Sequence, residues 1–171
     1  MEEAAERFLA LRRIAVTGVS RKSGESAANP VYVRLRKAGY EVFAVNPNAE
    51  EVEGDRAYPS LSAIDGGVEA VVIATAPQHA MGTVQEAERL GVRHVWMHRG
   101  AGEGSVSPEA VTWGRERGIT VLDGGCPLMF GRTSDGLHRF MCRWLTRTGN
   151  VPREIETPDD QTDPRPDLDG R

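Results

Sequence analysis

The sequence has few of the features that mark secreted, metal-binding or membrane-spanning proteins. Only two cysteines occur among its 171 residues, Cys126 and Cys142, and they form neither a paired metal-ligand spacing nor a disulfide framework. No run approaches the ~20 apolar residues needed to span a bilayer. The N-terminal stretch is acidic early and lacks a long apolar core, so it does not resemble a secretory signal. We therefore expect a reduced, cytoplasmic setting without membrane contact.

Lysine is also scarce, with Lys22 and Lys37 the only two, so nearly all basic charge is carried by arginine. The net charge is −4, and most of it comes from residues 157–171, where five aspartates face two arginines. The rest is close to neutral, which argues against nucleic-acid binding through a broad basic face. The acidic segment has too little apolar surface to offset the entropy of ordering. We expect one domain over residues 1–150 and a disordered tail over 151–171.

Apolar segments of strand length alternate regularly with segments of helical periodicity. Near-continuous apolar strands separated by helices indicate a parallel sheet covered on both faces. Right-handed crossovers then favour an α/β fold, a Rossmann-like doubly wound sheet of about five strands. The expected strands are 13–19, 40–47, 68–77, 92–100 and 119–125, and the expected helices are 30–39, 78–91, 107–118 and 134–147, with a helical turn at 60–64.

The segment VTGVSRKSGESAANP joins the first expected strand to the first expected helix. It contains small residues and two adjacent cations, Arg21 and Lys22, and a helix N-terminus that follows a strand is suited to an anion. Of the dinucleotide fingerprint G-x-G-x-x-G, however, only Gly18 is present, because Ser20 and Ser23 occupy the other two positions. The loop therefore predicts phosphate binding but is weak evidence for NAD.

The end of the second expected strand is a further test of an NAD site. Such a site usually has Asp or Glu there, which binds the ribose hydroxyls. This chain has Asn46 and Pro47 instead. They leave a flat apolar surface beside an amide, so the usual clamp on the ribose diol is missing.

Five segments, IAVTGVS, GYEVFAVNP, GDRAYPSLSAI, VVIATAP and VRHVWMHRGAG, follow one another at intervals that resemble a known family. This family is the stand-alone CoA-binding proteins, whose Rossmann-like domain is similar to the CoA-binding domain of the succinyl-CoA synthetase α subunit. The resemblance covers about residues 8–130, and it rests on the order of the segments more than on any single one.

The resemblance implies a site for CoA or an acyl-CoA around four strand ends. The first loop would hold the pyrophosphate, with its cations near the CoA phosphates, and the second strand end would flank the adenosine. The third and fourth strand ends would border the pantetheine arm. The implied cofactor-binding residues are Thr17, Gly18, Val19, Ser20, Arg21 and Lys22, then Val45, Asn46 and Pro47, then Thr75 and Pro77, and finally Gly100.

The chain also departs from the family pattern. Members often carry a proline and an arginine in the first loop, where this chain has Ser23, Gly24 and Glu25, and an arginine where this chain has Ala76. These changes leave the choice between CoA and NADP open. Cys126, in the segment DGGCP, could meet the CoA thiol, but no neighbouring cation is evident in the sequence, so we interpret it as a small buried residue.

We expect a binding module without catalysis of its own, because no catalytic cluster or metal site is evident and the synthetase domain that carries the phosphorylated histidine would not fit in this chain. His79 and Asp123 lie near strand ends without a supporting motif, and Glu86 and Glu88 are interpreted as solvated helix charges. The alternative is an NAD(P)-binding oxidoreductase or redox sensor. A subunit that works with a protein partner, or a homo-oligomer, is also left open.

Overall fold

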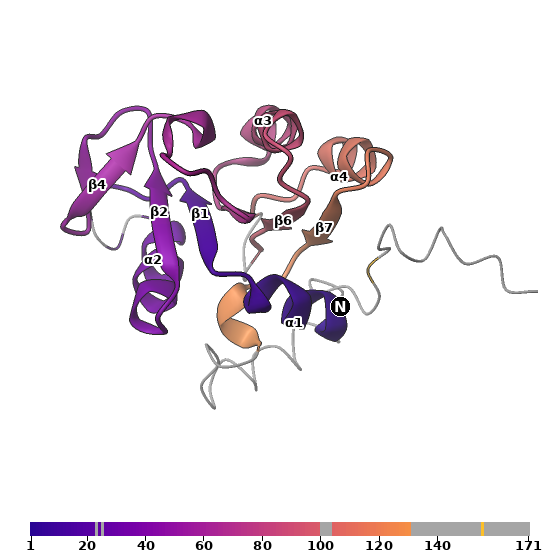
Figure 1. Ribbon diagram of the computed structural model, residues 1–171, viewed down its shortest axis with the longest axis horizontal. Coiled ribbons are helices and arrows are strands. Elements are labelled where there is room, and N and C mark those ends of the chain that lie inside the picture. The colour runs from indigo at the N-terminus through magenta and orange to yellow at the C-terminus, as the bar shows by residue number, and fades with distance from the viewer. Residues whose placement is uncertain (23, 25, 100–103, 131–154, 156–171) are drawn as a thin grey trace, which may run out of the picture.

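A computed structural model describes residues 1–130, apart from 23, 25 and 100–103, together with residue 155. The described residues form a seven-stranded sheet in the order β3-β4-β2-β1-β5-β6-β7 (Figure 1). The strands are β1 (Arg13–Thr17), β2 (Glu41–Val45), β3 (Glu51–Val52), β4 (Asp55–Tyr58), β5 (Ala70–Ile73), β6 (His94–Met97) and β7 (Thr120–Asp123). The helices are α1 (Glu2–Ala10), α2 (Ala28–Lys37), α3 (Ala80–Arg89) and α4 (Pro108–Arg115), with short 3₁₀ turns η1 (Leu61–Ala63), η2 (Pro77–His79) and η3 (Pro127–Met129).

The sheet is parallel except where β3 pairs with β4. Strand β1 lies between β2 and β5, so the strand order reverses beside it, as in a doubly wound sheet. The α/β Rossmann-like prediction and its five strands are confirmed. The sheet gains two more strands from a hairpin, β3–β4, whose turn residues Glu53 and Gly54 have φ angles of 51° and 78°. Two consecutive residues with positive φ are typical of a tight two-residue hairpin turn.

Helices cover both faces of the sheet. Figure 1 shows α1 and α2 on one side and α3 and α4 on the other. The side chains of β1 alternate accordingly: Ile14 and Val16 belong to the core cluster that includes α1 and α2, and Ala15 belongs to the cluster that includes α3 and α4. This burial on both faces is why the strands read as continuous apolar runs in the sequence.

Helix α1 was not expected from the sequence. Its residue Phe8 is fully buried and meets Trp96 of β6 edge to face, with ring centroids 5.3 Å apart. Such an aromatic pair contributes ~0.5–1.5 kcal/mol beyond the burial of its area. The contact fixes α1 against the β6 side of the sheet.

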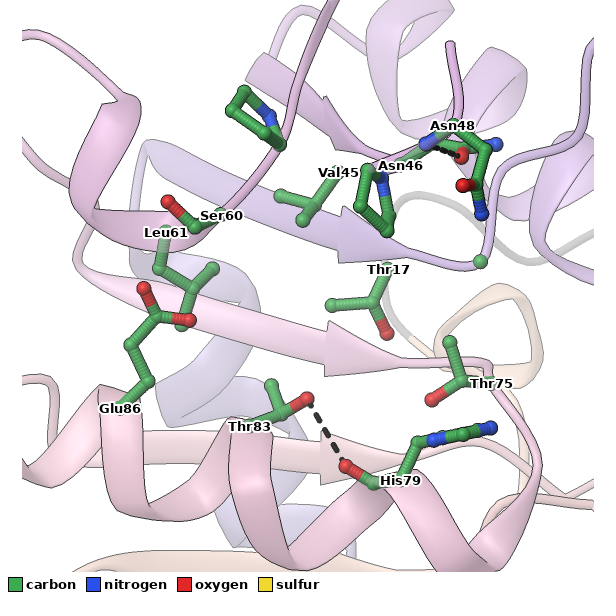
Figure 2. A pocket seen from close by; sticks show the side chains of 13 residues that line it. Thr17, Val45, Asn46, Asn48, Ser60, Leu61, Thr75, His79, Thr83 and Glu86 are labelled. Carbon is green, nitrogen blue, oxygen red and sulfur yellow. Dashed lines mark hydrogen bonds between the residues drawn. The ribbon is translucent and has the colours of Figure 1, made fainter.

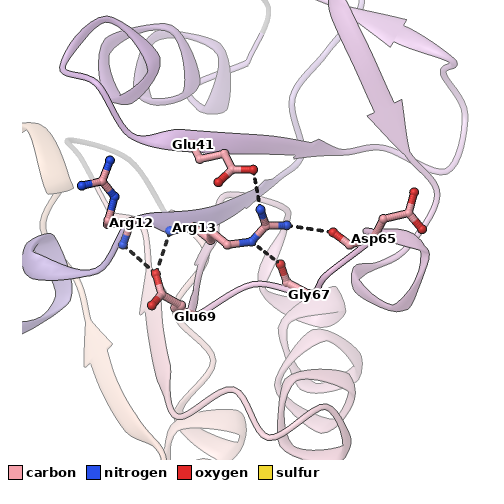
Figure 3. Close-up of polar contacts among 6 residues, drawn as sticks. All are labelled: Arg12, Arg13, Glu41, Asp65, Gly67 and Glu69. Atoms are coloured by element: carbon pink, nitrogen blue, oxygen red, sulfur yellow. Dashed lines mark hydrogen bonds and ion pairs between the residues drawn. The ribbon is translucent and has the colours of Figure 1, made fainter.

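Polar contacts hold the amino ends of β1, β2 and β5 together (Figure 3). The Arg13 guanidinium pairs with Glu41 and donates hydrogen bonds to two carbonyls, Gly67 O at 2.9 Å and Asp65 O at 2.8 Å. Glu69 accepts the backbone N–H groups of residues 12 and 13 at 2.7 and 2.9 Å. These bonds lower the pKa of Glu69. These contacts leave the opposite edge, at the carboxyl ends of the parallel strands, available for a ligand-binding site.

The expected helix 134–147 and the expected tail lie outside the described residues, except for Ile155. Ile155 is buried against the core cluster that includes α1 and α2. None of the described helices is long and apolar enough to cross a membrane.

Candidate functional site

A pocket of about 430 Å³ lies at the carboxyl ends of β1, β2 and β5 (Figure 2). Ligands of open parallel sheets bind at this edge, where the strand order reverses. Its volume falls within the ~300–1,000 Å³ of small-molecule sites. The lining residues are Thr17, Gly18, Val45, Asn46, Pro47, Asn48, Pro59, Ser60, Leu61, Thr75, His79, Thr83 and Glu86.

The structure brings together many of the residues predicted for the site. Those that line the pocket are Thr17, Gly18, Val45, Asn46, Pro47 and Thr75. Their contact with a ligand stays a prediction.

The other predicted residues do not line this pocket. Val19 is fully buried, while Arg21 and Lys22 are exposed on the loop that follows β1. Pro77 begins the turn η2. Gly100 lies outside the described residues. The charged part of the predicted site is therefore on the loop, beside the pocket rather than in it.

Gly18 is required by the packing of the protein itself. Its φ is +81°, and a Cβ atom on it would lie 2.8 Å from the carbonyl oxygen of Ala74 and 3.2 Å from Thr75 Cγ2. Its N–H also donates to Val45 O at 3.2 Å. The end of β1 thus passes so close to the residues after β5 that a side chain has no space.

A buried amide holds the first loop. Asn29, only 2% exposed, accepts the Ser20 N–H at 2.9 Å and donates to the Ser20 carbonyl at 2.8 Å. Its Nδ2 also donates to Glu53 of the hairpin turn at 2.6 Å. Ser26 adds a hydrogen bond to Gly18 O at 2.8 Å. Sequence reasoning missed Asn29, although a small polar residue in the first turn after such a loop is a recognisable signal.

Both the nitrogen and the oxygen of the Asn46 side-chain amide form hydrogen bonds within the protein. Its Nδ2 donates to Val19 O at 2.8 Å, and its Oδ1 accepts the Asn48 N–H at 2.8 Å. The side chain therefore fixes the first loop to the end of β2. This end of the strand still has no carboxylate, as the sequence indicated.

The wall formed by η1 and α3 was not predicted. Glu86, interpreted above as a solvated helix charge, also lines the pocket, and its Oε1 accepts the Ser62 N–H at 3.1 Å. On the other side of the pocket, Thr75 Oγ1 is buried and has no hydrogen-bond partner among the described residues. The pocket therefore offers a carboxylate and a hydroxyl group to a ligand.

Cys126 follows β7 and is buried, in agreement with the prediction of a small buried residue. Burial raises the pKa of its thiol to about 11. Because the thiolate is the reactive form, this cysteine is a poor nucleophile near neutral pH. Burial also lowers the pKa of His98, which directly follows β6, because it disfavours the charged imidazolium.

A model of the CoA-binding domain family matches residues 12–132 of the chain. The chain belongs to this family. It is 32% identical over 111 residues to the uncharacterized protein YneT of Bacillus subtilis (strain 168), over 65% of this chain and 78% of YneT. The resemblance found in the sequence is thus confirmed for the family.

Solved structures agree with this family fold. A hypothetical protein from Pyrococcus horikoshii OT3 matches with a TM-score of 0.68 and 30% identity, over 75% of this chain and 87% of that chain. The dinucleotide-forming acetyl-coenzyme A synthetase 1 of Ca. Korarchaeum cryptofilum matches with a TM-score of 0.54 and 24% identity, over 64% of this chain and 25% of that chain. The second likeness is one of fold alone.

Proposed function

We propose that this member of the CoA-binding domain family is a cytoplasmic protein that binds CoA or an acyl-CoA without catalysis of its own. The observation that carries the proposal is the pocket where the strand order reverses, with Asn46 and Pro47 at the β2 end in place of a ribose-binding carboxylate. We assign the binding domain to residues 1–150 and an acidic tail to residues 151–171, of which Ile155 packs against the domain.

The phosphates of CoA would lie on the loop after β1. Arg21 and Lys22 are exposed there, directly after the loop segment that Asn29 holds in place. Several phosphate charges favour nearby cations, which form stronger, charge-assisted hydrogen bonds with phosphate oxygens. The loop therefore supplies the positive charge of lysine and arginine, which are absent from the described residues that line the pocket.

The uncharged parts of CoA would follow the strand ends. Val45 and Pro47 offer apolar surface to the adenosine at the end of β2. Thr75, Pro77 and Gly100 would border the pantetheine arm beyond β5 and β6. Cys126 holds its proton too tightly to react readily with a CoA thiol, which favours simple binding over covalent exchange.

Calorimetric titration of the purified chain with CoA, acetyl-CoA and NADPH tests this function. CoA is expected to bind, and more tightly than NADPH. Lys22→Ala should weaken CoA binding by about threefold to tenfold, because a cation beside a phosphate is lost. Lys37→Ala is the matched control, since Lys37 is exposed in the last turn of α2.

Absence of CoA binding at millimolar concentration would overturn the proposal. Tighter binding of NADPH than of CoA would instead favour the NADP alternative, in which the loop cations accept a 2′-phosphate.

A further inference from the structure

The charge distribution in the pocket indicates which part of a ligand enters it. Its ionisable side chains, among the described residues, are the imidazole of His79 and the carboxylate of Glu86, and no arginine or lysine lines it. The cations Arg21 and Lys22 lie outside, on the first loop. A phosphate would be repelled by the carboxylate, so the pocket is suited to an uncharged group whose phosphates remain on the loop.

The walls of the pocket are suited to a flat ring. Val45 and Leu61 are buried aliphatic side chains, and Pro47 and Pro59 add two rigid rings from separate segments. Polar groups at the pocket wall then fix the orientation of a ligand held between apolar walls.

Glu86 is the polar group best placed to form a hydrogen bond with a substituent of such a ring. Figure 2 shows its side chain extending from α3 toward Ser60 and Leu61. Its Oε1 accepts the Ser62 N–H at 3.1 Å, which holds the carboxylate in place. A carboxylate only accepts hydrogen bonds and has about four acceptor sites, so Oε2 is left to receive an N–H from a ligand.

We propose that Glu86 is a specificity-determining residue that accepts a hydrogen bond from the exocyclic amino group of a purine, so that the pocket selects a 6-aminopurine over a 6-oxopurine. This inference rests on the proposed function, because the purine is taken to be the adenine end of CoA. A 6-oxopurine would place a carbonyl oxygen against the carboxylate, and two acceptors facing each other lose the hydrogen bond and repel.

The test compares CoA with its deaminated analogue, in which hypoxanthine replaces adenine, by calorimetry on the full chain. The wild-type protein is expected to bind CoA about tenfold more tightly, since the analogue loses one hydrogen bond to the carboxylate. The variant Glu86→Gln keeps an oxygen for the Ser62 N–H and turns an amino group toward the ligand. Its preference should disappear or reverse toward the 6-oxo analogue.

Glu88→Gln is the matched control, because Glu88 lies on the same helix and does not line the pocket. It should keep the wild-type preference. Equal wild-type affinity for the two ligands would overturn the inference while leaving CoA binding intact, and so would a preference that survives in Glu86→Gln. Failure of wild-type protein to bind either ligand would overturn the proposed function and this inference with it.

Discussion

At the scale of single residues, a glycine at position 18, after the first strand, can be required either by a ligand or by the packing of the fold. The family resemblance implied that it lines the loop for the pyrophosphate, but a Cβ atom on it would also lie only 2.8 Å from the carbonyl oxygen of Ala74. A substitution should therefore reduce the stability of the fold even when no ligand is present.

We expect Gly18→Ala to lower the free energy of unfolding by about 3 kcal/mol or more. A left-handed backbone costs an L-residue ~1–2 kcal/mol, and displacing a carbonyl adds to this. Gly39→Ala is the matched control, because Gly39 has a φ of +92° with no atom within 4 Å of the added Cβ. It should lose only ~1–2 kcal/mol. Equal losses in urea unfolding would contradict a steric role for Ala74.

The pocket residues expected from the sequence lie at strand ends, whereas Glu86, which was missed, lies on a helix. The family resemblance implied Val45, Pro47 and Thr75, which lie together because parallel strands all end at one edge of the sheet. Glu86 was not expected at the pocket, because its spacing on α3 reads as a solvated face. In the folded chain it lines the pocket, where its carboxylate accepts the Ser62 N–H of the turn η1.

At the scale of elements, the β3–β4 hairpin was the part of the sheet that the sequence did not reveal. Strands β3 and β4 are short and mostly polar, with Glu51, Asp55 and Arg56 among their residues, so no apolar run marks them in the sequence. The hairpin matters for the site because Glu53 in its turn bonds to Asn29, which in turn holds Ser20 of the first loop. An added element thus supports the loop predicted to hold phosphate.

We expect Asn29→Asp to lower the free energy of unfolding by ~2–3 kcal/mol. The Ser20 carbonyl and the Glu53 carboxylate would lose the Nδ2 donor, and a second carboxylate would face Glu53. Combining Asn29→Asp with Glu53→Gln removes the charge repulsion and restores a donor between the two side chains. The double variant should recover ~1 kcal/mol relative to the sum of the single losses. Additive losses in a double-mutant cycle would show that the two side chains are not coupled.

At the scale of the whole molecule, the amino ends of the parallel strands contribute to stability and their carboxyl ends form the candidate binding site. The amino edge is fixed by Arg13 and Glu69, and the carboxyl edge carries the pocket. The alternation of strands and helices in the sequence predicted the carboxyl edge, because parallel strands all end there. It did not predict the bonds between Glu69 and the backbone N–H groups of residues 12 and 13, which depend on β1 and β5 lying side by side.

We expect Glu69→Ala to lower the melting temperature by a few degrees at pH 7 while leaving the affinity for CoA unchanged, because the lost bonds lie at the edge opposite the pocket. The backbone N–H groups of Arg13 and then Arg12 hold the pKa of Glu69 below its ordinary value. Its stabilisation is therefore present above the unfolded-state pKa and is lost as the pH falls through the lowered folded-state pKa. Thermal unfolding from pH 7 to pH 3 should accordingly show the difference between wild type and variant shrinking toward acid. A difference that stays constant over this range, or a weaker CoA affinity, would show that Glu69 acts in some other way.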